Sequence, residues 1–250
     1  MIMNMVQRLS WWLTLTWLVA ALSTVKTAMV SRFPVNFRHN HKTAFRIFYQ
    51  TGNSESDLPE CPPMVVCNRV DTYSTPWIER QCRCPGKKIC SMSMDPRDGF
   101  TVMDKSRQLK LCEPVSRLPT CGYFRDIAWT HAIYPDNTTK QTVHCMCPKN
   151  SVAYILRHEV YNTQDGMTVI YFMACSPLSK MRCQRKEPCR LFTVTKRPDV
   201  EEVSMNTLCQ CPHGHRCPQH HTEPSVTGGS TSFTGEPVRT YSGYCTSEML

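Results

Sequence analysis

The sixteen cysteines are the residues of this 250-residue sequence whose chemistry and spacing stand out most. Three copies of Cys-x-Cys-Pro begin at Cys82, Cys145 and Cys209. Around them the cysteines fall into sets of six, four and six, at positions 61, 67, 82, 84, 90 and 112, then 121, 145, 147 and 175, then 183, 189, 209, 211, 217 and 245. This recurrence predicts three tandem copies of one structural unit.

The middle set indicates one of the pairings, because it lacks counterparts of Cys67 and Cys90. Both counterparts are missing together, and an even number of cysteines remains in the middle set. We therefore expect Cys67 to be bonded to Cys90 and, by analogy, Cys189 to Cys217. In a β-strand, residues i and i+2 point to the same face, so one Cys-x-Cys strand can send one bond upstream and one downstream. Which cysteine bonds in which direction stays open.

A catalytic thiol and a zinc site are the other chemistries to consider. His144 beside Cys145 could act as base and nucleophile, with Asp126 or His158 as a third member, but a nucleophilic cysteine must be free. The histidines of segment 213–221 have a density typical of zinc ligands. The repeat accounts for every cysteine without either site. We therefore expect no enzymatic activity, no cofactor and no metal, with the histidines in an exposed polar turn.

The N-terminal region predicts the compartment. The apolar run Trp11–Leu22 and the small residues near Ser23 indicate a signal peptide over residues 1–23, followed by a loose basic leader over 24–44. The run is short for a membrane span, and an uncleaved anchor is the alternative. Disulfides persist in oxidising compartments, so we expect a secreted, extracellular protein without membrane insertion. The sequon at Asn137 predicts glycosylation.

The remaining pattern favours an all-β, disulfide-rich fold, since 18 prolines interrupt short runs of alternating β-branched and aromatic residues. Small domains of this kind need covalent staples. Strands are predicted at 45–50, 77–81, 108–112, 141–144, 151–156, 168–175 and 190–196. We expect three cysteine-stapled β domains at 45–116, 117–177 and 178–250, here called units 1, 2 and 3, joined as a semi-rigid arm. Residues 222–236 are predicted to form a polar loop.

Charge and aromatic residues favour a binding protein. The 29 Lys and Arg outnumber the 20 Asp and Glu, giving a net charge of +9. A basic extracellular surface attracts acidic proteins or sulphated matrix glycans, and nucleic acid is not expected outside the cell. Aromatic residues and arginines dominate binding hot spots. The ligand-contact candidates are Trp77, Arg80, Trp129, Arg185, Lys186 and Phe192.

Several segments resemble the giant-lens (Argos) family: FYQ at 48–50, DLPEC at 57–61, TPWIERQCRCP at 75–85, FRD at 124–126, ACSPL at 174–178, RCQRK at 182–186, GHRCP at 214–218 and TYSGYC at 240–245. The resemblance runs over nearly all of residues 45–245. It implies three domains similar to three-finger and receptor-ectodomain modules, which clamp and sequester an EGF-like ligand of the Spitz type and so antagonise EGF receptor signalling. Only residues 86–89 stand where the best-known member of the family has a long insertion.

The three-finger likeness also favours the remaining bonds: Cys61–Cys82, Cys84–Cys112, Cys121–Cys145, Cys147–Cys175, Cys183–Cys209 and Cys211–Cys245. The crossed alternative exchanges the partners within each Cys-x-Cys. Direct blockade of the receptor ectodomain is the alternative function. An EGF-like growth factor is disfavoured by the four-cysteine middle unit, and a secreted protease inhibitor is a further possibility.

Overall fold

The computed structural model describes residues 45–196, 200–232 and 238–247, without the side chains of 230–232. The predicted signal peptide and leader lie outside the described residues. Within the described residues, no helix is long and apolar enough to cross a membrane.

The prediction of an all-β, disulfide-rich fold is confirmed. The strands are β1 (Arg46–Tyr49), β2 (Val66–Asp71), β3 (Trp77–Arg80), β4 (Thr101–Asp104), β5 (Arg107–Leu111), β6 (Ile127–Ile133), β7 (Thr139–Val143), β8 (Ser151–Thr163), β9 (Gly166–Pro177), β10 (Pro188–Lys196), β11 (Glu201–Thr207), β12 (His215–Arg216), β13 (Val226–Ser232), β14 (Val238–Tyr244) and β15 (Thr246–Ser247). Two short 3₁₀ turns, η2 (Glu55–Asp57) and η3 (Val115–Arg117), complete the described elements.

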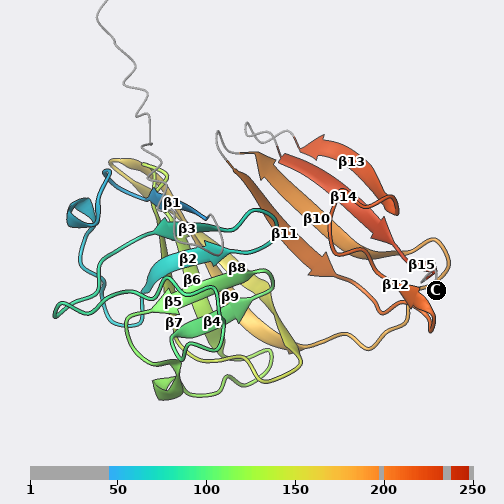
Figure 1. Cartoon of the computed structure of the whole chain (residues 1–250), viewed down its shortest axis with the longest axis horizontal. Coiled ribbons are helices and arrows are strands. Elements are labelled where there is room, and N and C mark those ends of the chain that lie inside the picture. The colour runs from blue at the N-terminus through green and yellow to red at the C-terminus, as the bar shows by residue number, and fades with distance from the viewer. Residues whose placement is uncertain (1–44, 197–199, 233–237, 248–250) are drawn as a thin grey trace, which may run out of the picture. The chain divides into compact units, whose positions relative to one another are not determined.

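The three units have one topology (Figure 1). Their sheets run in the orders β3-β2-β5-β4, β7-β6-β9-β8 and β11-β10-β14-β13. Unit 1 adds β1, which pairs in parallel with β3, and unit 3 adds the small β12-β15 ribbon. The repeat read from the cysteines is therefore also a repeat of strand order.

Each Cys-x-Cys lies just beyond a strand, which differs from the expectation of a strand running through it. β3 ends at Arg80. Beyond it the Gln81 N–H still donates to the Cys67 carbonyl at 2.9 Å, and Arg83 forms an isolated parallel bridge to Glu60. The Cys61 N–H donates to the Arg83 carbonyl at 2.8 Å, and the Arg83 N–H donates to the Pro59 carbonyl at 2.9 Å. Met146 and Gln210 bridge Thr120 and Arg182 in the same way. One extended residue is thus enough to hold the two sulfurs apart.

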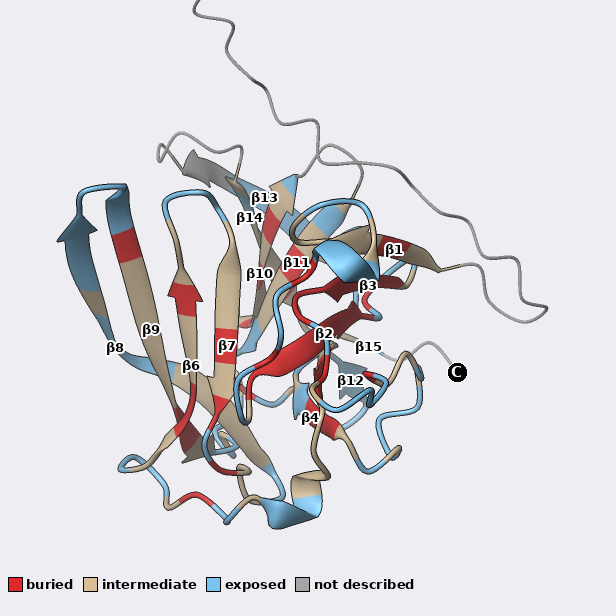
Figure 2. Ribbon diagram, turned by 90° about the vertical axis from the view of Figure 1, so that its left-hand side faces the viewer, coloured by how far each residue is buried: buried red, intermediate tan, exposed pale blue. Residues whose placement is uncertain are grey.

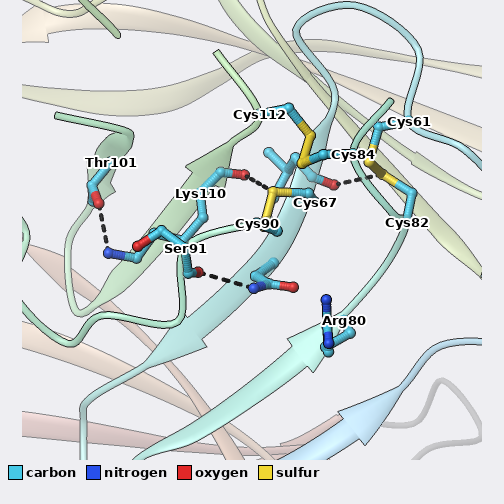
Figure 3. The surroundings of a disulfide bond; sticks show 12 residues. Cys61, Cys67, Arg80, Cys82, Cys84, Cys90, Ser91, Thr101, Lys110 and Cys112 are labelled. Carbon is cyan, nitrogen blue, oxygen red and sulfur yellow. Dashed lines mark hydrogen bonds between the residues drawn. A yellow bond between two sulfur atoms is a disulfide. The ribbon is translucent and has the colours of Figure 1, made fainter. Parts of the chain in front are cut away.

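All sixteen cysteines are in disulfides, and the eight bonds join the same pairs as the sequence argument and the resemblance favoured. In each unit the first cysteine of Cys-x-Cys bonds upstream and the second downstream. Figure 3 shows the three bonds of unit 1, with Cys82 reaching Cys61 and Cys84 reaching Cys112.

Two strand predictions were too short and one loop prediction was wrong. The runs predicted at 151–156 and 168–175 belong to a long hairpin in which β8 and β9 stay paired from Ser151 and Pro177 to Thr163 and Gly166. Residues 226–232, predicted as loop, form β13, because their backbone pairs with β14 despite the glycines. The register shifts between Gly228 and Thr231, as expected where glycines permit a bulge. Residues 233–236 of that predicted loop lie outside the described residues.

The largest apolar cluster crosses the predicted boundary between units 1 and 2. Val66, Leu109 and Leu111 of unit 1 pack with Trp129 and Val143 of unit 2. Figure 2 shows buried positions on β2 and on β6 and β7 of the neighbouring sheet. Backbone pairing also joins the units, since the Val143 N–H donates to the Met64 carbonyl at 2.9 Å. Units 1 and 2 therefore share one core, while the predicted domain boundaries themselves stay predictions.

Candidate ligand-binding surfaces

A buried ion network joins unit 1 to unit 3. Arg69 on β2 is 2% exposed and contacts Glu79 at 2.8 Å and Glu202 of β11 at 3.0 Å. Arg107 contacts the same Oε1 of Glu202 at 3.0 Å and Asp71 at 3.7 Å. Burial disfavours the charge of Arg69, but Glu79, Glu202 and Asp71 outweigh it and raise the pKa of Arg69 above its ordinary value. We call these five side chains the junction.

Tyr73, at the tip of the β2–β3 hairpin, extends the contact between the two units. Its ring packs with His220 at 5.0 Å and lies parallel to His221 at 5.9 Å, beside the buried Phe192 of β10. The His221 N–H donates to the Tyr73 hydroxyl at 2.7 Å, and the hydroxyl lies 3.0 Å from His221 Nδ1. Unit 3 thus holds an aromatic side chain of unit 1 by both ring packing and hydrogen bonds.

Unit 2 reaches the junction through His131 on β6. Its Nδ1 is buried and has no hydrogen-bond partner among the described residues. Burial and the positive charge of Arg69 lower the pKa of His131 from 6.5 to about 4, so the imidazole is neutral at physiological pH. The charges of the junction therefore act on a titratable side chain of unit 2.

The long β8–β9 hairpin carries the main exposed apolar surface of unit 2. Cross-strand partners share a face, and the register pairs Tyr171 with both His131 and His158, and Val160 with Val169. The side chains on this face are Ile155, His158, Val160, Asn162, Met167, Val169 and Tyr171, here called the β8–β9 face. Ile155, Val160 and Met167 are 55%, 49% and 57% exposed. Proteins rarely leave such residues together in water without a binding role.

The same sheet face is covered over β6 and β7 and uncovered over β8 and β9. Trp129, opposite Met173 in the register, is buried against unit 1. The ring of Tyr171 lies 6.4 Å from His131 and 6.0 Å from His158, so it connects the covered part to the exposed part. The turn of the hairpin needs Gly166, because its φ is +127° and a Cβ at this position would lie 2.9 Å from the Cβ of Pro135. The opposite face is more polar, with Arg157 over the Phe172 ring at 4.4 Å.

Most residues predicted to contact a ligand are buried, which corrects that expectation. Trp77 and Trp129 are 3% exposed and Phe192 is fully buried. Trp129 packs against unit 1, and Phe192 packs with Val194, Val203 and Tyr73. Arg80 makes a bidentate ion pair with Glu55 at 2.7 and 3.0 Å and is also buried. The structure brings none of these rings to the surface.

The other two candidates are exposed. Arg185 and Lys186 lie in the turn of Gln184 to Glu187, within the loop closed by the Cys183–Cys209 bond. The sequon residue Asn137 is also exposed, in the β6–β7 turn, where its N–H donates to the Tyr134 carbonyl at 2.9 Å.

The groups considered for catalysis and zinc have other partners. The sulfur of Cys145 is bonded to Cys121, so it is no nucleophile for His144, and burial lowers the pKa of that histidine. The cysteine clusters with ligand-like spacing are made of disulfide sulfurs, which carry no thiolate charge. In the 213–221 segment, His213, His215 and His220 are exposed, as expected. The rings of His220 and His221 also pack on Tyr73, with His221 half-buried.

The sequence pattern missed the junction and the β8–β9 face. Arg69 lies within the ordinary strand β2 and Tyr73 just after it, and nothing local marks Glu202 as the partner of Arg69. The β8 sequence did carry a signal, because Ile155, Leu156, Val160 and Tyr161 surround charged residues in a strand with exposed positions on both faces.

Comparisons with known proteins agree on one family. Residues 100–226 match the family model "Antagonist of EGFR signalling, Argos". The protein giant-lens of Drosophila melanogaster is 34% identical over 318 aligned positions, covering 80% of this chain and 71% of that protein. U-scoloptoxin(11)-Sm5a of Scolopendra morsitans is 25% identical and covers 58% of this chain and 65% of the toxin. The crystal structure of unliganded Argos is 50% identical, with a TM-score of 0.53, over 82% of this chain and 99% of that one.

Proposed function

Because this chain belongs to the Argos family of antagonists of EGFR signalling, we propose that it is secreted and that it binds and sequesters an EGF-like ligand of the Spitz type. The β8–β9 face is its proposed ligand contact. The exposed Ile155, Val160 and Met167 carry the proposal. They extend the sheet face that is otherwise covered by unit 1, so they are rigidly presented before any ligand arrives. A pre-organised apolar surface loses little entropy on binding.

Sequestration needs contacts from more than one unit. Three stapled units that meet at the junction can touch a small EGF-like domain from several sides, and such linked contacts raise affinity together. The exposed basic turn of Arg185 and Lys186 in unit 3 is a second contact for an acidic ligand surface, and it also suits sulphated matrix glycans.

We assign glycosylation to Asn137, whose exposed turn leaves room for the glycan.

A pair of neighbouring substitutions tests the proposed face. Val160 and Tyr161 are similarly exposed, at 49% and 47%, but lie on opposite faces of β8. Val160→Ser combined with Met167→Ser should weaken binding to an immobilised EGF-like domain by about 25-fold, since anchor residues contribute about 1 kcal/mol or more each and the two together about 2 kcal/mol. Tyr161→Ser is the matched control and should bind as the wild type does. Equal weakening of binding by the Val160/Met167 double variant and by Tyr161→Ser would refute the assignment of the face.

The runner-up is direct blockade of the receptor ectodomain, and a parallel measurement separates it. The wild-type chain is passed over the EGF-like domain and over the receptor ectodomain in the same experiment. A sequestering protein binds the ligand and is titrated out by an equal number of ligand molecules. Binding to the receptor alone would refute sequestration.

A further inference from the structure

Strand β8 forms one edge of the unit 2 sheet, and among the described residues no strand or bridge pairs with its outer side. In Figure 2 it stands at the outside of the sheet and is mostly exposed. An edge strand presents a row of unpaired backbone N–H and C=O groups, which is a template for pairing with another chain. The outer side of β8 is therefore a possible interaction surface.

The equivalent edge strands of the other two units are poor templates for pairing. β4 in unit 1 is only four residues long, and β13 in unit 3 contains two glycines. A short strand offers few unpaired backbone groups, and glycine weakens a strand. β8 has 13 residues and contains no glycine, proline or lysine, so the protection common at sheet edges is missing from unit 2 alone.

The charges of β8 are arranged so that they suit a second copy of the same strand. Arg157 and Glu159 flank His158 and form an exposed ion pair at 3.5 Å. Two antiparallel copies of β8, related by a twofold axis between their His158 residues, place Arg157 of each copy opposite Glu159 of the other. Opposite charges in directly facing positions stabilise a pair of strands, whereas like charges destabilise it.

The same alignment brings exposed apolar side chains together. The next position along each strand sets Leu156 of one copy opposite Val160 of the other, and these side chains are 39% and 49% exposed. The register shift between Ile155 and Arg157 is a β-bulge, which disturbs regular pairing. The matching segment is therefore short, from residue 156 to residue 160.

Neighbouring side chains hold both charges in place on one copy alone. The guanidinium of Arg157 lies 4.4 Å from the centre of the Phe172 ring, and Glu159 accepts a hydrogen bond from the Tyr161 hydroxyl. All four side chains lie on the face of the hairpin opposite the β8–β9 face. Side chains that are already ordered lose little entropy when a partner arrives.

We propose that β8 pairs with β8 of a second copy of this chain, so that the four strands of each unit 2 sheet join into one continuous sheet. The contact is isologous, because the same residues face each other across a twofold axis. Cross-strand neighbours share a face, so the β8–β9 faces of both copies lie on the same side and stay uncovered. The dimer does not depend on the proposed function. Its small contact area predicts a weak dimer, present at high protein concentration.

Exchange of the two charges tests this alignment. Arg157→Glu sets two carboxylates opposite each other, and Glu159→Arg sets two guanidinium groups opposite each other. Each single variant should raise the dissociation constant of the dimer about tenfold or more, because both cross-strand pairs become repulsive together. Arg157→Glu combined with Glu159→Arg restores opposite charges and should dimerise as the wild type does. An equimolar mixture of the two single variants should form a heterodimer for the same reason.

Sedimentation velocity of the full chain, at concentrations rising into the high micromolar range, measures these dissociation constants. Arg97→Glu is the matched control for Arg157→Glu. Arg97 is also exposed and also pairs with an acidic residue two positions away, at 3.2 Å from Asp95 in unit 1. The control makes the same change in net charge and should dimerise as the wild type does.

The outcomes decide between this alignment, another surface and no dimer. Loss of the dimer in the single variants and its recovery in the double variant support the proposal. A wild type that stays monomeric overturns it, as does a dimer that both single variants retain or that the double variant fails to recover. If the single variants fold poorly, hydrogen exchange of the wild type decides: the amides of residues 156–160 should become more protected as the concentration rises, and unchanged protection overturns the proposal. Failure to bind an EGF-like domain would refute the proposed function and leave these results unaffected.

Discussion

Neutral His131 makes the stability of this protein depend on pH in a way that one substitution can isolate. The imidazole is partly buried on β6, next to the positive Arg69. Burial first, and Arg69 second, lower its pKa from 6.5 to about 4. A folded-state pKa below the unfolded value means that the unfolded chain takes up a proton first as the pH falls. The folded state therefore loses stability between pH 6.5 and pH 4, and stability rises with pH across that window.

The size of the effect follows from the two pKa values of 6.5 and about 4. The loss is negligible at pH 7.5, about 2 kcal/mol at pH 5, and about 3 kcal/mol below pH 4. With a urea dependence of about 2 kcal/mol per molar, the loss at pH 5 corresponds to a midpoint lowered by about 1 M.

Urea unfolding with the disulfides intact, at steps from pH 7.5 to pH 4.5, measures this loss. In His131→Gln the part of the pH dependence caused by the imidazole should vanish, so the wild type should lose about 2 kcal/mol more than the variant on going to pH 5. His158→Gln is the control, because that exposed imidazole stays in water in both states. A wild type and a His131→Gln variant with parallel pH dependence would show that His131 titrates normally and is not held neutral at the junction.

Four further outcomes test the covalent frame, the buried charge of Lys110 in unit 1 and the glycosylation of unit 2. Replacing Cys67 and Cys90 together by Ala should lower the free energy of unfolding by about 3 kcal/mol in urea titrations, because the bond closes a loop with a sequence separation of 23. A chelator should leave the melting temperature unchanged while a reductant lowers it, and chelator-induced unfolding would instead indicate zinc. Asp98→Asn should cost about 3–5 kcal/mol, since it removes the carboxylate at 2.8 Å from the fully buried Lys110. A smaller loss would mean that water reaches that amine. Asn137→Gln should remove one glycan from the secreted protein, visible as a single step in gel mobility.

The cysteine frame could be predicted from the sequence because its information is local and repeated. The missing pair in unit 2 was enough to indicate Cys67–Cys90, and the repeat of Cys-x-Cys-Pro implied one strand order used three times. The strands before the Cys-x-Cys-Pro motifs were also recognisable from the sequence, since β3 and β7 end close to the residues at which the alternation of apolar and polar side chains stops. The long β8–β9 hairpin was underestimated because residues 157–163 are mostly polar or charged and exposed on both faces.

The surfaces could not be predicted, because they depend on contacts between residues far apart in the sequence. Arg69 and Glu202 are separated by 133 positions, and no local pattern marks them as partners. The aromatic candidates were misplaced for a related reason. A tryptophan in a short strand serves equally as a core residue or an exposed anchor, and only the position of the neighbouring sheet decides between them. Trp129 is buried because the sheet of unit 1 covers it.

Ala128 shows how unit 2 manages with one disulfide fewer. The carbonyls of Cys67, Ala128 and Cys189 accept equivalent backbone hydrogen bonds, from Gln81, His144 and Leu208, so Ala128 stands at the position of the missing cysteine. It is fully buried in the core that units 1 and 2 share. A disulfide stabilises mainly by restricting the unfolded chain, whereas Ala128 and Trp129 stabilise by packing against a neighbour. Unit 2 therefore depends on unit 1 for part of its stability, and the shared core holds these two units together.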